Sequence, residues 1–487
     1  MEYQTKQKLN RENSGSTEKL PIKFLQFGEG NFLRAFVDYL IDKMNKEAGF
    51  NAGVAVIQPT QGGLVDMLEE QDNLYTLFVR GVKKGQIVDD QRVISAIQRS
   101  FSPYDNYAEY LELAKGEDLQ FILSNTTEAG IAFDESETAL SSGPHKNFPA
   151  KVTAFLYERF KHFNGDSEKG LHIIPCELIE NNALTLKEYI LKYAQLWNLE
   201  KDFSTWIENS NYFHNTLVDR IVPGYPREEK DEYEAKLDYD DNLMVVCEAF
   251  LLWVIEGDEK LKALIPFDKI DDQVLIVDDI TPYRTRKVRI LNGAHTAMLA
   301  FSILDGKETV KEAIDADFAG QWISDTVYNE IIPTLDLSTE ELTAFSDEVF
   351  DRFRNPFLKH QLSSIALNSV SKFKVRVLPS LLKYVEIKNE LPTNLTFALA
   401  ALIRFYQGEF DEKQLPVSDD APVLERFKEI WSTNDLGEVA KNALSEVTFW
   451  DTDLTQVSGL TEAVTKALSA IDSTGIEEGY KSYINNL

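Results

Sequence analysis

The order of local patterns between residues 22 and 58 constrains the fold of this chain more than any other feature. Residues 22–27 (IKFLQF) are short and mostly apolar, as expected for a buried strand, and the stretch GEGNFLRAF follows directly. The next apolar residues recur at the spacing of one helix face: Leu33, Phe36, Val37, Leu40, Ile41 and Met44. Residues 53–58 (GVAVIQ), followed by Pro59, predict another strand. This order predicts a βαβ unit and a parallel sheet.

The glycine turn between the first strand and the helix predicts a dinucleotide-binding site. In such a turn Gly28 permits the tight bend, and Gly30 lets the backbone approach a pyrophosphate, which then rests on the helix N-terminus. Leu33 stands where a third glycine is usual, and a turn with only a structural role is the alternative. Arg34 could face a phosphate or pair with a surface acid. The predicted cofactor-binding residues here are Phe27, Gly28, Glu29, Gly30, Asn31, Phe32, Leu33 and Arg34.

Two features bear on the identity of the cofactor. The second strand ends in Gln58, where an acid normally binds the adenine ribose, and we include Gln58 among the cofactor-binding residues. Between Lys46 and Arg80 there is no basic residue, so no cation close in sequence can meet the 2′-phosphate of NADP. The sequence therefore favours NAD.

A loop after a further apolar stretch is a second candidate for cofactor contact. Residues 119–124 (LQFILS) predict a buried strand, and Thr127 and Glu128 follow it. Ligands of a doubly wound sheet bind outside the carboxyl ends of the strands, so both residues are predicted to reach the cofactor. A capped turn without a ligand explains this spacing equally well.

The chain is expected to form two domains. Residues 172–175 and 274–277 add strands, and from about Lys287 onward long periodic stretches predict helices. We therefore predict an α/β fold with a Rossmann-type dinucleotide-binding domain over residues 20–280, followed by a mostly α-helical domain over 281–487. Residues 1–19 are polar and predict a disordered tail.

Charge and cysteine content exclude several classes of protein. The chain has 50 Lys and Arg against 80 Asp and Glu, a net charge of −30, and no basic stripe, so nucleic acid and anionic membranes are not expected partners. Cys176 and Cys247 suit a reducing compartment, and no metal-binding spacing is present. The first twenty residues lack the apolar core of a signal peptide. We expect a cytoplasmic, metal-free protein that is a monomer or a small homo-oligomer.

Residues 287–295 (KVRILNGAH) carry the strongest signal for chemistry. Asn292 and His295 are three apart and share one face of a helix, while Lys287 lies about 80° around that helix or at its entry. A partly buried lysine can act as the base for the hydroxyl proton of a secondary alcohol. An amide and an imidazole can hold the reacting oxygen. The alternative is a solvated lysine, a capping asparagine and a histidine buried in the core.

Several segments together resemble one enzyme family. They are FGEGNFLRAFVDYL (27–40), QDNLYTLFVRG (71–81), NTLVDRIVP (215–223), KVRILNGAHT (287–296) and SKFKVRVLP (371–379). The chain, from about residue 20 to its C-terminus, is similar to the polyol-specific long-chain dehydrogenase/reductases, also called the mannitol dehydrogenase family. The Lys-x4-Asn-x2-His pattern, together with Val218-Asp219-Arg220, is highly specific for that family.

The resemblance implies a Rossmann-type domain, a helical domain, an active site in the cleft between them and a metal-independent reaction. It implies that Lys287 is the general acid/base and that Asn292 and His295 bind and polarise the reacting oxygen. Asn182 matches a family asparagine that helps form the oxyanion site. Lys372 matches a second lysine that contacts substrate, although Lys374 lies only two residues away.

The chain departs from the family's mannitol enzymes in a way that bears on the substrate. Those enzymes have an acid three residues before the catalytic lysine, where this chain has Arg284, and an acid where it has Gln58. Arg284 could pair with the carboxylate of a sugar acid, which a neutral polyol lacks, or it could pair with Asp278 or Asp279. We expect a sugar-acid substrate. The alternatives are a fructuronate reductase, a mannitol or arabinitol 2-dehydrogenase, a sugar-phosphate dehydrogenase and a cofactor-binding sensor without turnover.

Overall fold

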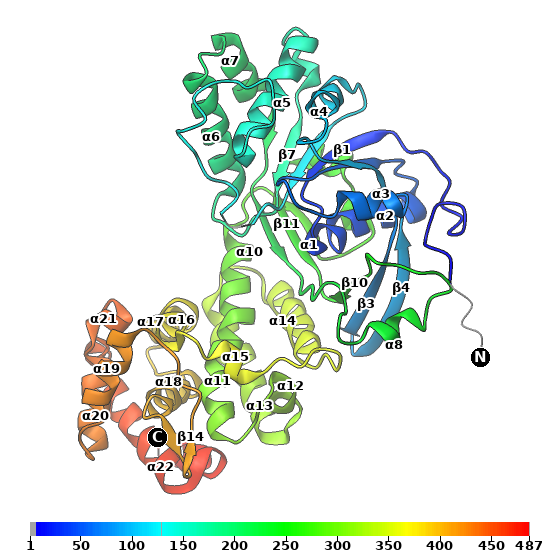
Figure 1. Cartoon of the computed structure of the whole chain (residues 1–487). Coiled ribbons are helices and arrows are strands. Elements are labelled where there is room, and N and C mark those ends of the chain that lie inside the picture. The colour runs from blue at the N-terminus through cyan, green and yellow to red at the C-terminus, as the bar shows by residue number, and fades with distance from the viewer. Residues whose placement is uncertain (1–5, 128, 487) are drawn as a thin grey trace. The chain divides into compact units, whose positions relative to one another are not determined.

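The computed structural model describes residues 6–127 and 129–486. The chain divides into two compact units, each with its own core (Figure 1). Unit 1 comprises the chain up to Arg80 together with Val88–Ile280, and unit 2 comprises Gly81–Ile87 together with the chain from Thr281 onward.

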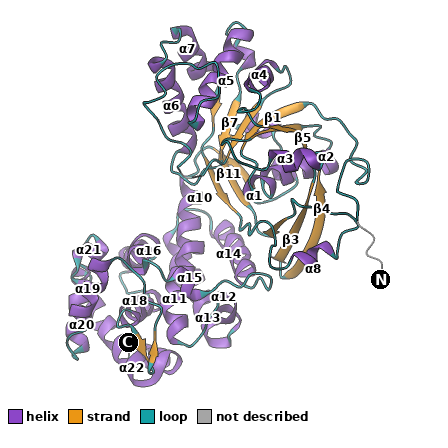
Figure 2. Cartoon of the chain, viewed as in Figure 1, coloured by secondary structure: helices purple, strands orange, loops and turns teal. Residues whose placement is uncertain are grey.

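A six-stranded parallel sheet forms the centre of unit 1 (Figure 2). Its order is β5-β2-β1-β6-β7-β8, with β1 (Ile22–Phe27) between β2 (Gly53–Ile57) and β6 (Phe121–Ser124). The other strands are β5 (Ile97–Phe101), β7 (His172–Pro175) and β8 (Tyr212–Phe213). The strand order reverses between β1 and β6, and a doubly wound sheet binds its ligand at such a point.

Both faces of this sheet are buried, as a parallel sheet requires. On one face Phe24 of β1 packs in a cluster with Leu40 and Ile41 of α2 (Val37–Ala48). On the other face Leu25 and Phe27 pack with side chains of α5 (Phe148–His162) and α6 (Asn182–Leu196). The alternation follows from the two-residue period of a strand. The predicted fold class, a Rossmann-type domain followed by a mostly helical domain, is confirmed.

Two smaller sheets and several short helices complete unit 1, although the segment Gly81–Ile87, where two strands of one of these sheets meet, belongs to unit 2. One sheet has the order β10-β3-β4 and the other β12-β11-β9. Their strands are β3 (Tyr75–Lys83), β4 (Gln86–Ile94), β9 (Thr216–Asp219), β10 (Val245–Glu248), β11 (Leu252–Glu256) and β12 (Val274–Val277). The remaining helices are α3 (Val65–Glu70), α4 (Tyr107–Glu112), η1 (Leu113–Lys115), η2 (Ser167–Lys169), α7 (Lys201–Ser210), α8 (Lys230–Glu234), α9 (Glu259–Leu264) and η3 (Phe267–Lys269).

The helix expected after the glycine turn is in fact two helices. The short helix α1 (Asn31–Arg34) ends at Ala35, and α2 starts at Val37, with Phe36 at φ −124° and ψ −80° between them. Phe36 is fully buried, and its ring lies 4.8 Å from that of Phe32 and 5.5 Å from that of Trp253. The helix therefore breaks at Phe36, where the ring packs into the core, and the apolar spacing did not predict this break.

The polar segment expected as a disordered tail makes specific contacts where it is described. Leu9 is fully buried, and Lys6 Nζ donates to the backbone oxygens of Glu234 and Leu237. The Arg11 guanidinium donates to the Ile97 oxygen at 2.6 Å. The expectation of a disordered tail is therefore wrong for residues 6–19. Residues 1–5 lie outside the described chain.

Unit 2 is almost entirely helical. The segments α10 (Thr281–Arg286), η4 (Lys287–Asn292) and α11 (Gly293–Leu304) run without interruption as one helical rod (Figure 1). The rod packs against α18 (Thr393–Phe405). The other elements are α12 (Val310–Asp315), α13 (Asp317–Asp325), η5 (Thr326–Ile331), η6 (Ile332–Thr334), α14 (Thr339–Phe353), α15 (Leu362–Ile365), α16 (Ser369–Arg376), α17 (Leu378–Lys388), β13 (Glu409–Phe410), β14 (Lys413–Gln414), α19 (Ala421–Ile430), α20 (Leu436–Leu444), α21 (Val447–Trp450), η7 (Leu454–Gln456) and α22 (Leu460–Asn485).

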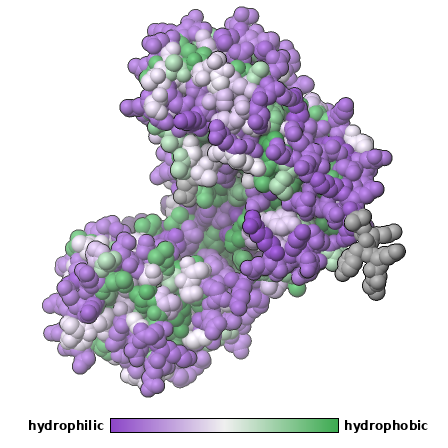
Figure 3. Space-filling view, in the orientation of Figure 1, coloured by the Kyte–Doolittle hydropathy of each residue, from purple (hydrophilic) through white to green (hydrophobic). Residues whose placement is uncertain are grey.

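Hydrophilic residues cover most of the visible surface (Figure 3). Of the helices in the described ranges, none combines the length and the apolar character needed to cross a membrane.

Candidate active site

The turns after β1 and β6 touch each other where the strand order reverses. Gly28 has φ +116°, and its N–H donates to the Ile57 oxygen at 3.0 Å. A Cβ atom at Gly28 would lie 3.0 Å from the backbone oxygen of Asn125. Only glycine combines this backbone conformation with this close approach. Gly28 therefore has the role in the tight turn that the sequence predicted.

Gly30 has different surroundings. Its φ is −67°, which any residue can adopt, and an added Cβ would meet no atom within 4 Å. The glycine thus leaves open space beside the turn rather than relieving strain. Space of this kind suits the close approach of a pyrophosphate to the backbone. The turn fits a dinucleotide.

The surroundings of Arg34 differ from the predicted ones, which were a phosphate or a surface acid. Its side chain is 2% exposed and donates to the backbone oxygens of Glu29 (3.1 Å) and Leu243 (2.7 Å) and to Asn31 Oδ1 (2.8 Å). It also lies 5.0 Å from the centre of the Tyr75 ring. The guanidinium therefore holds the turn from inside, with two backbone oxygens and an asparagine as its hydrogen-bond partners rather than a surface acid.

The apolar side chains of the turn also point into the protein. Phe27 is fully buried against Tyr110 and Phe148, and Leu33 is 1% exposed. Phe32 stacks on Phe36. These positions can offer a cofactor their backbone, whereas their side chains belong to the core. In addition, α1 has only four residues, so the long helix expected to receive the pyrophosphate is absent from the described turn.

Gln58 holds the loop that follows β2. Its side chain is 5% exposed, its Nε2 donates to the Thr60 oxygen at 2.9 Å, and Val65 N donates to its Oε1 at 3.4 Å. The Glu29 carboxylate reaches the same loop, where Leu64 N donates to its Oε1 at 3.4 Å. A Cβ at Gly63 would overlap both side chains, lying 2.2 Å from Glu29 Oε1 and 2.4 Å from Gln58 Oε1.

A buried carboxylate that sequence reasoning missed organises the turn after β6. Glu177 is 2% exposed and accepts hydrogen bonds from Ser124 Oγ, Thr126 N and Thr126 Oγ1, each at 2.9 Å. Burial raises the pKa of this carboxyl, and the hydrogen bonds oppose that effect. No local pattern marks Glu177, because its partners lie more than fifty residues away.

Thr127 occupies an unusual conformation in that turn. Its φ is +81°, which is rare for a β-branched residue and occurs mostly where the surrounding structure enforces it. Strained residues cluster at ligand sites, so this geometry supports the prediction that Thr127 contacts a cofactor. Glu128, the other predicted residue of this loop, lies outside the described residues.

Asn182 is fully buried at the start of α6. Its Nδ2 donates to the Pro175 and Glu177 oxygens and to Thr216 Oγ1, each at 3.1 Å. Its Oδ1 accepts from Thr216 N at 3.1 Å. Since both N–H groups are directed to groups of unit 1, the amide anchors the chain after β7. The direct contact with a reacting oxygen, predicted for this residue, is not what this geometry offers.

In unit 2, Lys287 and Asn292 are the first and last residues of a π-helical segment. In an α-helix residues five apart diverge by about 140°. The i→i+5 hydrogen bonds of a π-helix instead bring such residues toward one side, and π-helical turns are frequent at functional sites. Both side chains are half-buried. The sequence predicted their proximity to His295 but not this local geometry.

His295 lies one turn further along the rod. Its ring lies 4.4 Å from that of Phe353 at the end of α14 and 5.1 Å from that of His360. Burial, with a smaller contribution from Arg352, lowers the pKa of His360. His295 is half-buried as a residue, and its Nε2 atom is shielded from solvent.

Both candidate substrate lysines lie on α16, but they have different partners. Lys372 Nζ donates to the Ile365 oxygen at 3.1 Å, and burial, followed by nearby Arg376, lowers its pKa. Lys374 instead pairs with Asp451 at 3.1 Å, and that partner is 76% exposed. The end of α16 lies against the π-helical segment, because Arg289 donates to the Val375 oxygen at 2.7 Å. The two lysines of α16 therefore have different partners.

Two arginines of α10 differ in their surroundings. Arg286 is 4% exposed and lies 4.2 Å from the centre of the Phe345 ring and 5.1 Å from that of Tyr283. Arg284, the predicted carboxylate ligand, is half-buried on the same helix.

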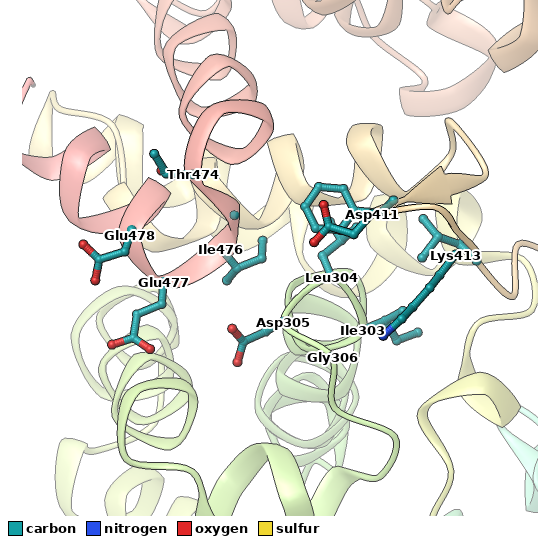
Figure 4. Close-up of a pocket in the computed structure, with 13 residues that line it drawn as sticks. Ile303, Leu304, Asp305, Gly306, Asp411, Lys413, Thr474, Ile476, Glu477 and Glu478 are labelled. Carbon is teal, nitrogen blue, oxygen red and sulfur yellow. The ribbon is translucent and has the colours of Figure 1, made fainter.

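A cavity of about 340 Å³ lies elsewhere in unit 2, beyond the C-terminal end of α11 (Figure 4). It contains none of the predicted site residues. Its walls include Asp305, Asp411, Glu477 and Glu478 against the single cation Lys413. An acidic wall of this kind repels an anion, so the cavity does not suit a sugar acid. Across the described ranges no group of three or more His, Cys, Asp and Glu is arranged to hold a metal ion.

Comparison with known proteins decides the family. Residues 22–269 match the model of the mannitol dehydrogenase Rossmann domain, and residues 279–472 match that of the mannitol dehydrogenase C-terminal domain. The chain belongs to the mannitol dehydrogenase family. The resemblance found in the sequence is thereby confirmed. This family member is an oxidoreductase of the dehydrogenase type that uses a nicotinamide dinucleotide.

Curated relatives are similar over almost the whole chain. An altronate oxidoreductase of Bacillus subtilis (strain 168) is 46% identical over 98% of both chains. One of Yersinia enterocolitica serotype O:8 / biotype 1B is 45% identical over 95% of this chain and 97% of its own.

Two solved structures share the fold. A D-sorbitol dehydrogenase in substrate-free form has a TM-score of 0.79 at 21% identity, over 97% of this family member and 100% of that chain. A Pseudomonas fluorescens mannitol 2-dehydrogenase in ternary complex with NAD and D-mannitol has a TM-score of 0.61 at 20% identity, over 99% and 100%.

Proposed function

We propose that this family member is an NAD-dependent tagaturonate reductase, which interconverts D-tagaturonate and D-altronate in the cytoplasmic breakdown of hexuronates. The observation that carries the proposal is the 45–46% identity, over 95–98% of the chain, to proteins named altronate oxidoreductase. The sequence pattern around Lys287 and the half-buried position of Arg284 support it.

Lys287 is the proposed general acid/base. In the reductive direction its ammonium group protonates the oxygen that was the ketone, and in the oxidative direction its amine removes the hydroxyl proton. When bound, the nicotinamide dinucleotide supplies the hydride to the carbon that carries this oxygen, or accepts it from that carbon in the oxidative direction. Because the lysine moves the proton, the reaction as proposed needs no metal.

Asn292 and His295 hold the reacting oxygen in this proposal. Each can donate one hydrogen bond to an oxygen that gains negative charge, and preorganised donors of this kind lower the barrier. The π-helical segment, which turns Lys287 and Asn292 toward one side, supports a shared task for the two residues. Asn182 acts as a positioning residue, because its amide ties the chain after β7 to Thr216.

The cofactor site is proposed in unit 1, with the backbone of the Gly28–Gly30 turn at the pyrophosphate and the Thr127 turn beside it. NAD is favoured over NADP because the loop after β2 has no cation of its own. Lys151, which is distant in sequence, lies near a tyrosine that contacts this loop. Lys151 lies 5.4 Å from the ring of Tyr104, whose hydroxyl bonds to Pro59, but its side chain is 1% exposed and donates to the Lys146 oxygen.

The sugar-acid substrate is proposed to contact Arg284 and Lys372. A guanidinium can bind a carboxylate through two parallel hydrogen bonds, and the lowered pKa of Lys372 suits a lysine that exchanges its partner for substrate. Replacing Arg284 by Ala should raise KM for the uronate about tenfold or more and change KM for a neutral ketose little. Equal effects on both substrates would contradict this assignment.

The deciding experiment measures NADH consumption with D-tagaturonate, D-fructuronate and D-fructose, and repeats each with NADPH. Fast turnover of D-tagaturonate with NADH is the expected result. Preference for D-fructuronate would indicate a fructuronate reductase, and preference for D-fructose a mannitol or arabinitol 2-dehydrogenase.

The Lys287→Ala variant separates an enzyme from a cofactor-binding sensor. The variant should lose turnover by about 10²- to 10⁴-fold while its Kd for NADH stays within a factor of two or so. A sensor would show no turnover before the change and none after it. Sedimentation of the same preparation checks the expected monomer or small homo-oligomer.

A further inference from the structure

The described structure leaves the second strand of the sheet without an acid for the adenine ribose. A Rossmann-type site commonly places Asp or Glu at the end of this strand, where the carboxylate binds the ribose hydroxyls. Here that position is Gln58, and its amide already bonds within the loop, to the Thr60 oxygen and from Val65 N.

The carboxylate of Glu29, from the glycine turn after β1, lies beside the loop that follows β2. Glu29 extends from the turn after β1 to the loop after β2, where Leu64 N lies 3.4 Å from its Oε1. Gly63 makes the approach possible, because a side chain there would collide with Glu29 Oε1 at 2.2 Å. Gly62, the preceding residue, has no atom within 4 Å of where its Cβ would stand. The loop that the carboxylate reaches therefore has open space at Gly62, one residue from the glycine that Glu29 contacts.

The environment of Glu29 calls for hydrogen-bond donors. The side chain is 8% exposed, and burial raises its pKa. Within the described ranges it forms no ion pair with a lysine, arginine or histidine, and the donor contributed by Leu64 is at the long end of hydrogen-bond distance. A mostly buried carboxylate is stable only when donors satisfy its oxygens. Two adjacent ribose hydroxyls supply such donors.

We propose that Glu29 binds the adenosine ribose diol of the cofactor and thereby selects NAD(H) over NADP(H). The proposal rests on the proposed function, since it concerns how that reductase chooses its cofactor. A 2′-phosphate at the same place would face the carboxylate, and like charges repel. The residues of the loop itself, 58–64, offer no cation to offset that repulsion.

The test compares binding of NADH and NADPH to the full-length protein at pH 8, by quenching of tryptophan fluorescence. The variants are Glu29→Gln, Glu29→Asp and, in the Glu29→Gln background, Gln58→Glu. Glu69→Gln, an exposed acid on the following helix α3, is the matched control. Thermal unfolding of each variant verifies that it is folded before the titration.

Wild type and the Glu69→Gln control should bind NADH at least about tenfold more tightly than NADPH. Glu29→Gln should weaken NADH binding about tenfold and leave NADPH binding unchanged or stronger, so that the preference collapses. Gln58→Glu should restore part of the preference, and Glu29→Asp should retain part of it.

Two results overturn the inference in different ways. An unchanged ratio of the two Kd values in Glu29→Gln, or an equal loss for both cofactors, would show that Glu29 only supports the turn. Wild-type protein that binds neither cofactor, or prefers NADPH, would overturn the proposed function along with it. If Glu29→Gln does not fold, the ratio measured with Glu29→Asp decides, because a shorter acid must reduce the preference.

Discussion

The backbone oxygen of Asn125 stands 3.0 Å from the position that a Cβ of Gly28 would occupy. Through this approach the turns after β1 and β6 close on each other where the strand order of the sheet reverses. Gly30, two residues later, has open space around it instead. Gly28 is therefore required by the fold of the turns, whereas at Gly30 the described residues leave room for a side chain, and we expect the ligand to be what requires a glycine there.

Alanine at the two glycines should separate these roles. Gly28→Ala should lower the free energy of unfolding by about 1–3 kcal/mol, because φ +116° strains an alanine and its methyl meets Asn125. Gly30→Ala should change the free energy of unfolding by less than about 0.5 kcal/mol and weaken NADH binding. Urea unfolding and NADH titration check both. Unchanged NADH affinity in Gly30→Ala would contradict the pyrophosphate assignment.

Removing the Glu177 carboxylate should disturb the cofactor turn. Glu177→Ala leaves Ser124 Oγ and Thr126 N without their buried acceptor, at a cost of about 1–3 kcal/mol in stability. If this carboxylate positions the Thr127 turn, the folded variant should also bind NADH several-fold more weakly. Calorimetric titration and thermal unfolding measure the two effects.

Glu330→Ala is the matched control for that variant. Glu330 is a buried carboxylate of unit 2 that accepts from Asn394 N and Leu395 N at the start of α18. Its loss should reduce stability by about 1–2 kcal/mol and leave the Kd for NADH unchanged. Equal NADH affinities in the two variants would show that Glu177 has only a structural role.

The two lysines of α16 should differ in their effect on substrate binding. Lys372→Met should raise KM for the uronate about tenfold, since in the proposed function the half-buried Lys372, whose Nζ donates to the Ile365 oxygen, contacts the substrate. Lys374→Met removes an ion pair with an exposed aspartate and should change neither KM nor kcat appreciably. Steady-state kinetics decide, and the reverse ranking would assign the substrate contact to Lys374.

His172 should make unit 1 less stable in acid. Burial, followed by the nearby His214, lowers the pKa of His172 to about 4, and its Nδ1 lies 2.9 Å from His214 Nε2. The unfolded chain, with a histidine pKa near ~6.5, therefore binds more protons than the fold between these two pH values. Stability is complete above pH ~6.5 and falls as the pH drops toward 4.

The variant His172→Phe keeps a ring for stacking on Tyr212 and should show a smaller loss of stability between pH 7 and 4.5. His162→Phe, at an exposed histidine, should keep the wild-type slope. Urea unfolding at several pH values measures both slopes. An undiminished slope in His172→Phe would assign the acid sensitivity to other groups.

Local patterns were sufficient for the elements and for their order. The apolar stretch 22–27, the glycine turn and the strand after Gly53 depend on spacings of two to four residues, and they predicted β1, the turn and β2. The same reasoning failed at Phe36, because the ring packs on Trp253, more than two hundred residues further along the chain. It also failed for Arg34, whose acceptor Leu243 is equally distant.

The sequence by itself determined the fold class and the family, because those depend on short spacings and on patterns such as Lys-x4-Asn-x2-His. It also supplied the residues that we predict carry out the dehydrogenase reaction. Only the tertiary structure decided how those residues are surrounded. It placed Glu29 beside the loop after β2, turned the amide of Asn182 toward its own unit and directed Lys372 and Lys374 to different partners. Such contacts join residues far apart in the chain, and no local spacing encodes which of them will meet when the core closes.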